Sequence, residues 1–152
     1  MEIVDALSKI EKIEKKASEL YGRYYSQFSQ DQEAAYFFYR IQIEERGHLS
    51  LTRYVKRLAT RNPELFESID CAEMDFKKIL VFLNAEISRV RRRTLEETLD
   101  KAEKFEVTLS EGYLTLLPLR NNPMLIDLYR ALTDSGHIKK ITAFRIKRMK
   151  EC

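Results

Sequence analysis

The chain has 152 residues, a length that fits one domain with its own hydrophobic core and leaves little room for a second. Only four Gly and three Pro occur, charged residues make up 34%, and strong helix formers are plentiful, so we expect a single all-α domain over residues 1–152. The formal net charge of +3, from 27 basic and 24 acidic side chains, is too small to indicate a nucleic-acid partner.

The N-terminal part of the sequence predicts a helical hairpin. Apolar residues over 3–28 recur in alternating steps of four and three, which is typical of one buried helix face. A second stripe of this kind covers residues 38–59 and follows Ser29 or Asp31, either of which could cap the helix. The Asn-Pro pair at 62–63 ends this second helix, because the residue before proline disfavours helical geometry.

The rest of the chain predicts a crossover and a second hairpin. Residues 64–93 hold a shorter apolar pattern, which indicates a short helix within a long connection. The four-and-three stripe returns over 95–116 and stops before Pro118. Asn-Pro at 122–123 then predicts the start of a fourth helix, whose inner face runs over 124–144. We therefore expect two helical hairpins joined by a long crossover containing a short helix.

The two predicted hairpins repeat each other in sequence. Residues 11–14 recur at 103–106, an offset of 92, and residues 45–48 recur in altered form at 134–137, an offset of 89. These matches fall on corresponding helices in the same order, as an internal duplication requires. Further equivalents at the first offset are Ser18 with Ser110 and Tyr21 with Tyr113.

Each of the four long stripes is interrupted near its middle by an acid, or by an acid and a histidine. A buried carboxylate is costly unless it is paired or binds a metal, and the first three stripes contain no Lys or Arg to pair with it. Two divalent cations would balance four carboxylates, and oxygen with imidazole nitrogen suits iron or manganese. The candidate metal ligands are Glu14, Glu45, His48, Glu106, Asp134 and His137.

The spacing of these residues supports chelation. An acid and a histidine three residues apart lie about 60° apart on one helix face, within reach of one ion. The only two histidines of the chain both stand in such units, at 45–48 and at 134–137. One Glu from each of two helices and a Glu-x-x-His from each of the other two is the known ligand pattern of ferritin-like di-iron proteins. The alternative is a scaffold in which these groups hydrogen-bond one another without metal.

On these residues the chain resembles the ferritin-like superfamily, and within it the rubrerythrin-like proteins, over nearly its whole length. The residues that carry the resemblance are Glu14 with Tyr21 and the unit at 45–48 in the first hairpin, and Glu106 with Tyr113 and the unit at 134–137 in the second. The resemblance implies a ferritin-like four-helix bundle in which the six candidates bind two Fe ions, with Mn or Zn as substitutes. Asp134 stands where the family usually has Glu, and the cysteine motifs of a rubredoxin domain are missing.

The implied function is that of a di-iron carboxylate oxidoreductase. Reaction with peroxide resembles the rubrerythrin peroxidase role, and an external electron donor would then be needed. Ferroxidase or iron-handling activity would use the same ligands, so the sequence does not separate the two. A non-enzymatic metal-binding or interaction scaffold is the alternative from a different class.

Four further residues lie near the candidate ligands. Glu11 and Glu103 stand three residues before two of them and are interpreted as solvated or interhelical charges, so they are left out of the ligand set. Tyr21 and Tyr113 follow about two turns after a candidate ligand, where a phenol could either hydrogen-bond a ligand carboxylate or simply pack.

The remaining signals concern partners and compartment. Aromatic residues 36–39 cover more than one helix face, which is compatible with a homodimer. The basic run 89–93 is interpreted as a solvated face rather than a DNA-binding element. Cys71 and Cys152 form no paired motif, and the longest apolar run, 79–83, is too short to span a membrane. We therefore expect a cytoplasmic protein without a membrane partner.

Overall fold

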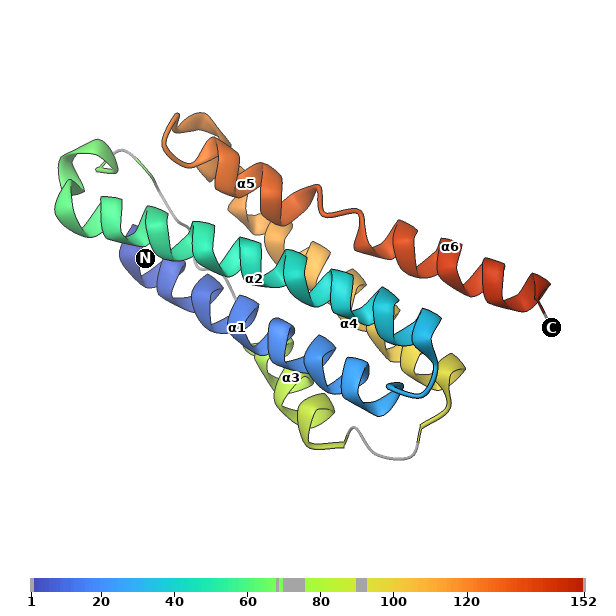
Figure 1. The fold of residues 1–152 in the computed structure, drawn as a ribbon. Coiled ribbons are helices and arrows are strands. Elements are labelled where there is room, and N and C mark those ends of the chain that lie inside the picture. The colour runs from blue at the N-terminus through green and yellow to red at the C-terminus, as the bar shows by residue number, and fades with distance from the viewer. Residues whose placement is uncertain (1, 68, 70–75, 90–92, 152) are drawn as a thin grey trace.

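The computed structural model describes residues 2–67, 69, 76–89 and 93–151, and these residues are largely helical, with no strand among them (Figure 1). The prediction of an all-α fold is confirmed. Both cysteines lie outside the described residues. No helix in the described part of the chain is both long enough and apolar enough to cross a bilayer.

The first hairpin forms as the sequence predicts. Helices α1 (Ile3–Gln27) and α2 (Gln32–Arg61) run antiparallel, side by side (Figure 1). Of the two candidate caps it is Asp31 that begins α2, because its side chain accepts a hydrogen bond of 3.1 Å from the backbone N–H of Ala34. The helix ends before Asn62, and a 3-10 turn over Pro63–Leu65 follows.

The crossover contains the predicted short helix, α3 (Lys77–Arg89), which packs against α1 and α4. Its buried Glu86 accepts a hydrogen bond of 2.8 Å from the Tyr24 hydroxyl and forms an ion pair with Arg93. The hydrogen bond between Tyr24 and Glu86 joins the crossover to the end of α1. Arg93 therefore has a structural partner, while residues 90–92 of the basic run lie outside the described residues.

The second hairpin departs from the prediction in its last helix. Helix α4 (Leu95–Tyr113) is capped by Thr94 and continues as a 3-10 helix over Leu114–Asn121. The chain then forms α5 (Ile126–Thr133) and α6 (His137–Lys150), with a break at 134–136 (Figure 1). The predicted continuous fourth helix with its start at 122–123 is thus wrong in two places.

Local hydrogen bonding and backbone geometry explain both departures. The Asn122 side chain accepts a hydrogen bond of 2.8 Å from the backbone N–H of Met124, so it caps a turn before α5 begins. At the break, Gly136 has a φ of 70°, a left-handed conformation that ends helices and that other residues adopt only at a cost. The backbone carbonyl of Gly136 then accepts a hydrogen bond from the backbone N–H of Lys140, and this is the first helical bond of α6.

The core lies between α1, α2, α4 and the α5–α6 segment, with α3 closing one side. Among the aromatic residues 36–39, Phe38 is buried and Phe37 stacks on Phe144 with ring centroids 4.3 Å apart. Tyr36 and Tyr39 are exposed, as the sequence predicts for part of this cluster. The largest fully buried side chains are Tyr21, Tyr24, Tyr113, Phe38, Phe105, Leu7, Ile10, Ile13, Leu20, Ile41 and Ile79.

Candidate metal centre

Five of the six candidate ligands meet in the middle of the bundle. They form two overlapping groups of three, and within each group the potential ligand atoms lie within 4.8 Å of one another. Residues of α1, α2, α4 and α6 contribute, so the site depends on all four elements. The first group is Glu14, Glu45 and His48, and the second group is Glu45, Glu106 and His137.

Glu45 belongs to both groups and lies between the two histidines. Its Oε2 is 3.9 Å from Nδ1 of His48, and its Oε1 is 3.0 Å from Nδ1 of His137. The two imidazole rings are nearly parallel, with centroids 6.1 Å apart. Glu45 is only 1% exposed. One carboxylate therefore offers one oxygen to each of two neighbouring sites.

The first group contains two buried oxygen atoms without a partner. Oε2 of Glu14 and Oε2 of Glu45 accept no hydrogen bond from any described residue. Nδ1 of His48 lies 3.6 Å and 3.9 Å from them, too far for a good hydrogen bond. Two ligand atoms that each lie about 2.1 Å from one ion are roughly 3 to 3.5 Å apart. Nδ1 of His48 lies slightly farther from both oxygens than this, so a bound cation would draw the three atoms closer together. In the metal-free protein a proton shared between Glu14 and Glu45 can pair these two oxygens instead.

The second group is held tightly by hydrogen bonds to His137. Its Nδ1 lies 3.0 Å from Glu45 and 3.2 Å from Oε1 of Glu106. Its Nε2 lies 2.6 Å from Oε2 of Glu44, whose other oxygen accepts a bond of 2.6 Å from Lys140. A carboxylate on the outer ring nitrogen fixes the tautomer and orientation of a ligating histidine.

Glu44 is a functional candidate that the sequence reasoning missed. It stands one position off the buried stripe of α2 and is half-buried, so the apolar pattern marks it as solvent-facing. The signal in the sequence was its position next to Glu45, together with Lys140 three residues after His137. The side chains of Glu44, His137 and Lys140 meet where α2 and α6 face each other.

The two tyrosines of the repeat bond to the candidate ligands in a crosswise manner. The Tyr21 hydroxyl of α1 donates to Oε1 of Glu106 on α4 at 2.6 Å, and the Tyr113 hydroxyl of α4 donates to Oε1 of Glu14 on α1 at 2.5 Å. Equivalent residues of the two halves thus make equivalent bonds. Burial and the adjacent carboxylates raise the pKa of both phenols well above the usual value, so both remain donors.

The buried carboxylates perturb one another and His137. Burial and the facing Glu14 carboxylate raise the pKa of Glu45 well above its usual value. Burial also opposes ionisation of Glu14, but Glu45 and His48 hold its pKa below the usual value. Burial alone would lower the pKa of His137, whereas Glu106 and Glu45 raise it to about 11. Without metal, His137 thus serves as the cation for this group of acids.

Asp134, the sixth predicted ligand, lies outside both groups. It is the exposed residue that ends α5, and its backbone N–H bonds to the carbonyl of Arg130. Because the helix stops there, the three-residue spacing to His137 no longer places the two side chains on one helix face. Asp134 therefore joins neither group of potential ligand atoms, although it lines the same surface pocket as Glu106 and His137.

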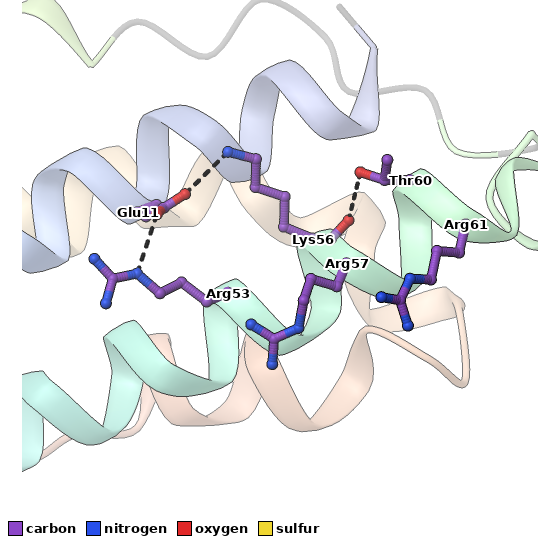
Figure 2. A pocket seen from close by; sticks show the side chains of 6 residues that line it. All are labelled: Glu11, Arg53, Lys56, Arg57, Thr60 and Arg61. Atoms are coloured by element: carbon purple, nitrogen blue, oxygen red, sulfur yellow. Dashed lines mark hydrogen bonds and ion pairs between the residues drawn. The ribbon is translucent and has the colours of Figure 1, made fainter.

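The two acids left out of the ligand set form interhelical ion pairs. Glu11 bonds to Nε of Arg53 at 3.1 Å and to Nζ of Lys56 at 3.0 Å, at the rim of a surface pocket on α2 (Figure 2). Glu103 bonds to Arg145 at 2.8 Å. Both acids therefore contact basic side chains on the outside of the bundle, as the sequence interpretation expected.

No protein-family model, no curated protein and no solved structure matches this chain.

The unpaired oxygen atoms of the first group give a test on the metal-free protein. We expect Glu45→Gln to raise the free energy of unfolding by about 1 kcal/mol at neutral pH, because the raised pKa of Glu45 means that folding must protonate this acid, whereas a neutral amide donates to Glu14 without that cost. Urea unfolding in the presence of a chelator measures this. Glu11→Gln, which removes an acid from an exposed ion pair, should change stability by less than about 0.5 kcal/mol. A clear loss of stability for Glu45→Gln would show that the acids form a satisfied network without metal.

Proposed function

We propose that this protein is a two-metal carboxylate protein, with two Fe ions as the resident metals and Mn or Zn as substitutes, in a ferritin-like arrangement of helices. The observation that carries the proposal is the position of Glu45, whose two oxygens serve two separate Glu-His groups. A carboxylate shared in this manner would offer one oxygen to each of two ions. A single-ion site would leave one of the two groups without a function.

The donor set supports this choice of metal. Three buried carboxylates and two imidazoles with Nδ1 facing inward offer hard oxygen and borderline nitrogen ligands, a set that iron and manganese accept and that zinc tolerates. Glu14, Glu45 and His48 would hold one ion, and Glu45, Glu106 and His137 the other. The five side chains leave coordination positions for small molecules from solvent.

The ferritin-like arrangement is supported by the relation between the two halves of the chain. In the first half Nδ1 of His48 lies 3.6 Å from Glu14, and in the second half Nδ1 of His137 lies 3.2 Å from Glu106. Each half also supplies a tyrosine whose hydroxyl donates to the glutamate of the other half. The sequence repeat and the crosswise bonds thus agree. The break between α5 and α6 is the main deviation from a regular bundle of this type.

The activity we propose is reduction of peroxide or O₂. Two ferrous ions would supply the two electrons that convert one peroxide, with two protons, into two waters, and an external donor would restore them. Side chains around the site would keep the ligands in fixed positions during this reaction. Tyr21 hydrogen-bonds one oxygen of Glu106, and Tyr113 hydrogen-bonds one oxygen of Glu14. Glu44 holds the ring of His137 in one orientation. The surrounding core excludes bulk water from Glu45.

The first prediction for this function concerns stoichiometry. Anaerobic loading with Fe(II) should give two ions per chain. Glu14→Gln should lose the ion near His48 and retain the other, whereas Glu45→Gln should lose both, because Glu45 serves both groups. Asp134→Ala should still bind two ions. Metal analysis after gel filtration counts them, and a wild-type ratio of one or zero would contradict a two-metal site.

The role assigned to Glu44 predicts a weaker second ion when this residue is removed. Loss of the carboxylate on a ligating histidine typically costs about 10- to 100-fold in metal affinity, so Glu44→Ala should show this loss at one of the two sites. Competition titration with a chromophoric chelator measures both affinities. Glu11→Ala is the matched control, since it also removes an acid that pairs with a lysine of a neighbouring helix but lies outside the site. Equal metal affinities in the wild type and in Glu44→Ala would show that Glu44 does not support metal binding by His137.

Reactivity separates the enzymatic candidates from a scaffold. If the protein is a peroxidase, stopped-flow spectra of the Fe(II)-loaded chain should show faster oxidation by peroxide than by an equal concentration of O₂. Faster oxidation by O₂ would favour a ferroxidase or iron-handling role. A loaded site that reacts with neither oxidant would support a non-enzymatic metal-binding scaffold instead.

A further inference from the structure

A pocket of about 350 Å³ opens at the break between α5 and α6. Its walls come from α4, from the end of α5 and from the first turn of α6. Two ligands of the second group, Glu106 and His137, belong to its lining although they are only 3% and 1% exposed. The pocket therefore leads from solvent to the second group. Its other polar lining residues are Ser110, Thr133, Asp134, Ser135 and Lys139.

Several polar groups of the pocket have no partner in the described part of the chain. Ser110, Asp134 and Lys139 are exposed and Ser135 is half-buried, and none of these four side chains hydrogen-bonds or ion-pairs with a described residue, so their polar groups face the solvent-filled pocket. Thr133 differs, because its hydroxyl donates to the backbone carbonyl of Tyr129 at 2.7 Å. Free hydroxyls and one charge of each sign suit a small molecule that both donates and accepts hydrogen bonds.

The first half of the chain shows how this opening arises. There α2 continues as a helix through residues 45–48, and Ser18, the equivalent of Ser110, is buried at 8% exposure. In the second half the helix stops at Thr133, and residues 134–136 are non-helical before α6 begins at His137. The departure of Asp134 from the site and the opening of the pocket are therefore two results of one break.

We infer that this pocket is the route by which a small hydrogen-bonding molecule, such as peroxide, reaches the site and binds on the second metal ion. The inference rests on the proposed two-metal function and adds to it a side of entry and a first point of contact. Ser110 lies one turn after Glu106 on α4 and is exposed, so both residues line the pocket from the same helix. Ser135 lines the pocket from the break between α5 and α6.

Filling the pocket tests this inference. Ser110→Phe and Ser135→Phe place a ring in the opening from two different walls, and Ser88→Phe adds the same ring to an exposed position of α3, away from the pocket. Each variant is loaded with Co(II), whose visible spectrum reports its ligands, and azide serves as the small-molecule probe. Circular dichroism and the Co(II) ratio establish that each variant is folded and loaded. A second readout is the rate at which a chelator removes Co(II).

Both pocket variants should bind two Co(II) ions but take up azide, and release metal to the chelator, at least about tenfold more slowly than the wild type and Ser88→Phe. Should one pocket variant fail to fold, the other carries the test. Wild-type rates in a folded and loaded pocket variant would overturn the inference and leave the two-metal proposal intact. A wild-type protein that binds no Co(II) would overturn both.

Discussion

The structure depends on the burial of three carboxylates in one apolar core. Glu14, Glu45 and Glu106 are each at most 3% exposed, and no Lys or Arg among the described residues forms an ion pair with them. Such a cluster is strongly unfavourable unless a cation compensates it. His137 supplies one positive charge, but the Oε2 atoms of Glu14 and Glu45 still lack a partner. In the metal-free protein the raised pKa of Glu45 retains a proton among these acids, and bound dications would take the place of that proton and of the charge on His137.

This constraint also fixes how the helices pack. Glu45 belongs to both groups of candidate ligands. Helix α2 therefore has to place it between Glu14 of α1 on one side and the residues of α4 and α6 on the other. The crosswise tyrosine bonds tie α1 to α4, and Glu44 with Lys140 ties α2 to α6. A shift of one residue along any of these helices would break a bond to a candidate ligand. The polar centre thus selects one register among the several that apolar stripes alone would allow.

The sequence predicted most of this arrangement because helical stripes and buried acids are local signals. The hairpin of α1 and α2, the Asp31 cap and five of the six clustered candidates lie where the spacing indicated. The break at 134–136 was missed although Thr133, Asp134, Ser135 and Gly136 all disfavour helix, since the match to residues 45–48 outweighed that local composition. Glu44 was missed because its role arises only from the α2–α6 contact, which no local pattern encodes.

The two halves of the chain therefore differ in structure at one position, with several effects. In the first half an unbroken α2 holds both Glu45 and His48 inward, so this half supplies the shared carboxylate for both groups. The second half places His137 inward but lacks the helical turn that would aim Asp134 beside it. The absence of that carboxylate from the buried group lowers the repulsion among the acids, and the break leaves the Glu106–His137 side next to a polar pocket. A centre of this kind would take ligands from both halves of the chain and be open to small molecules on the side of the second half.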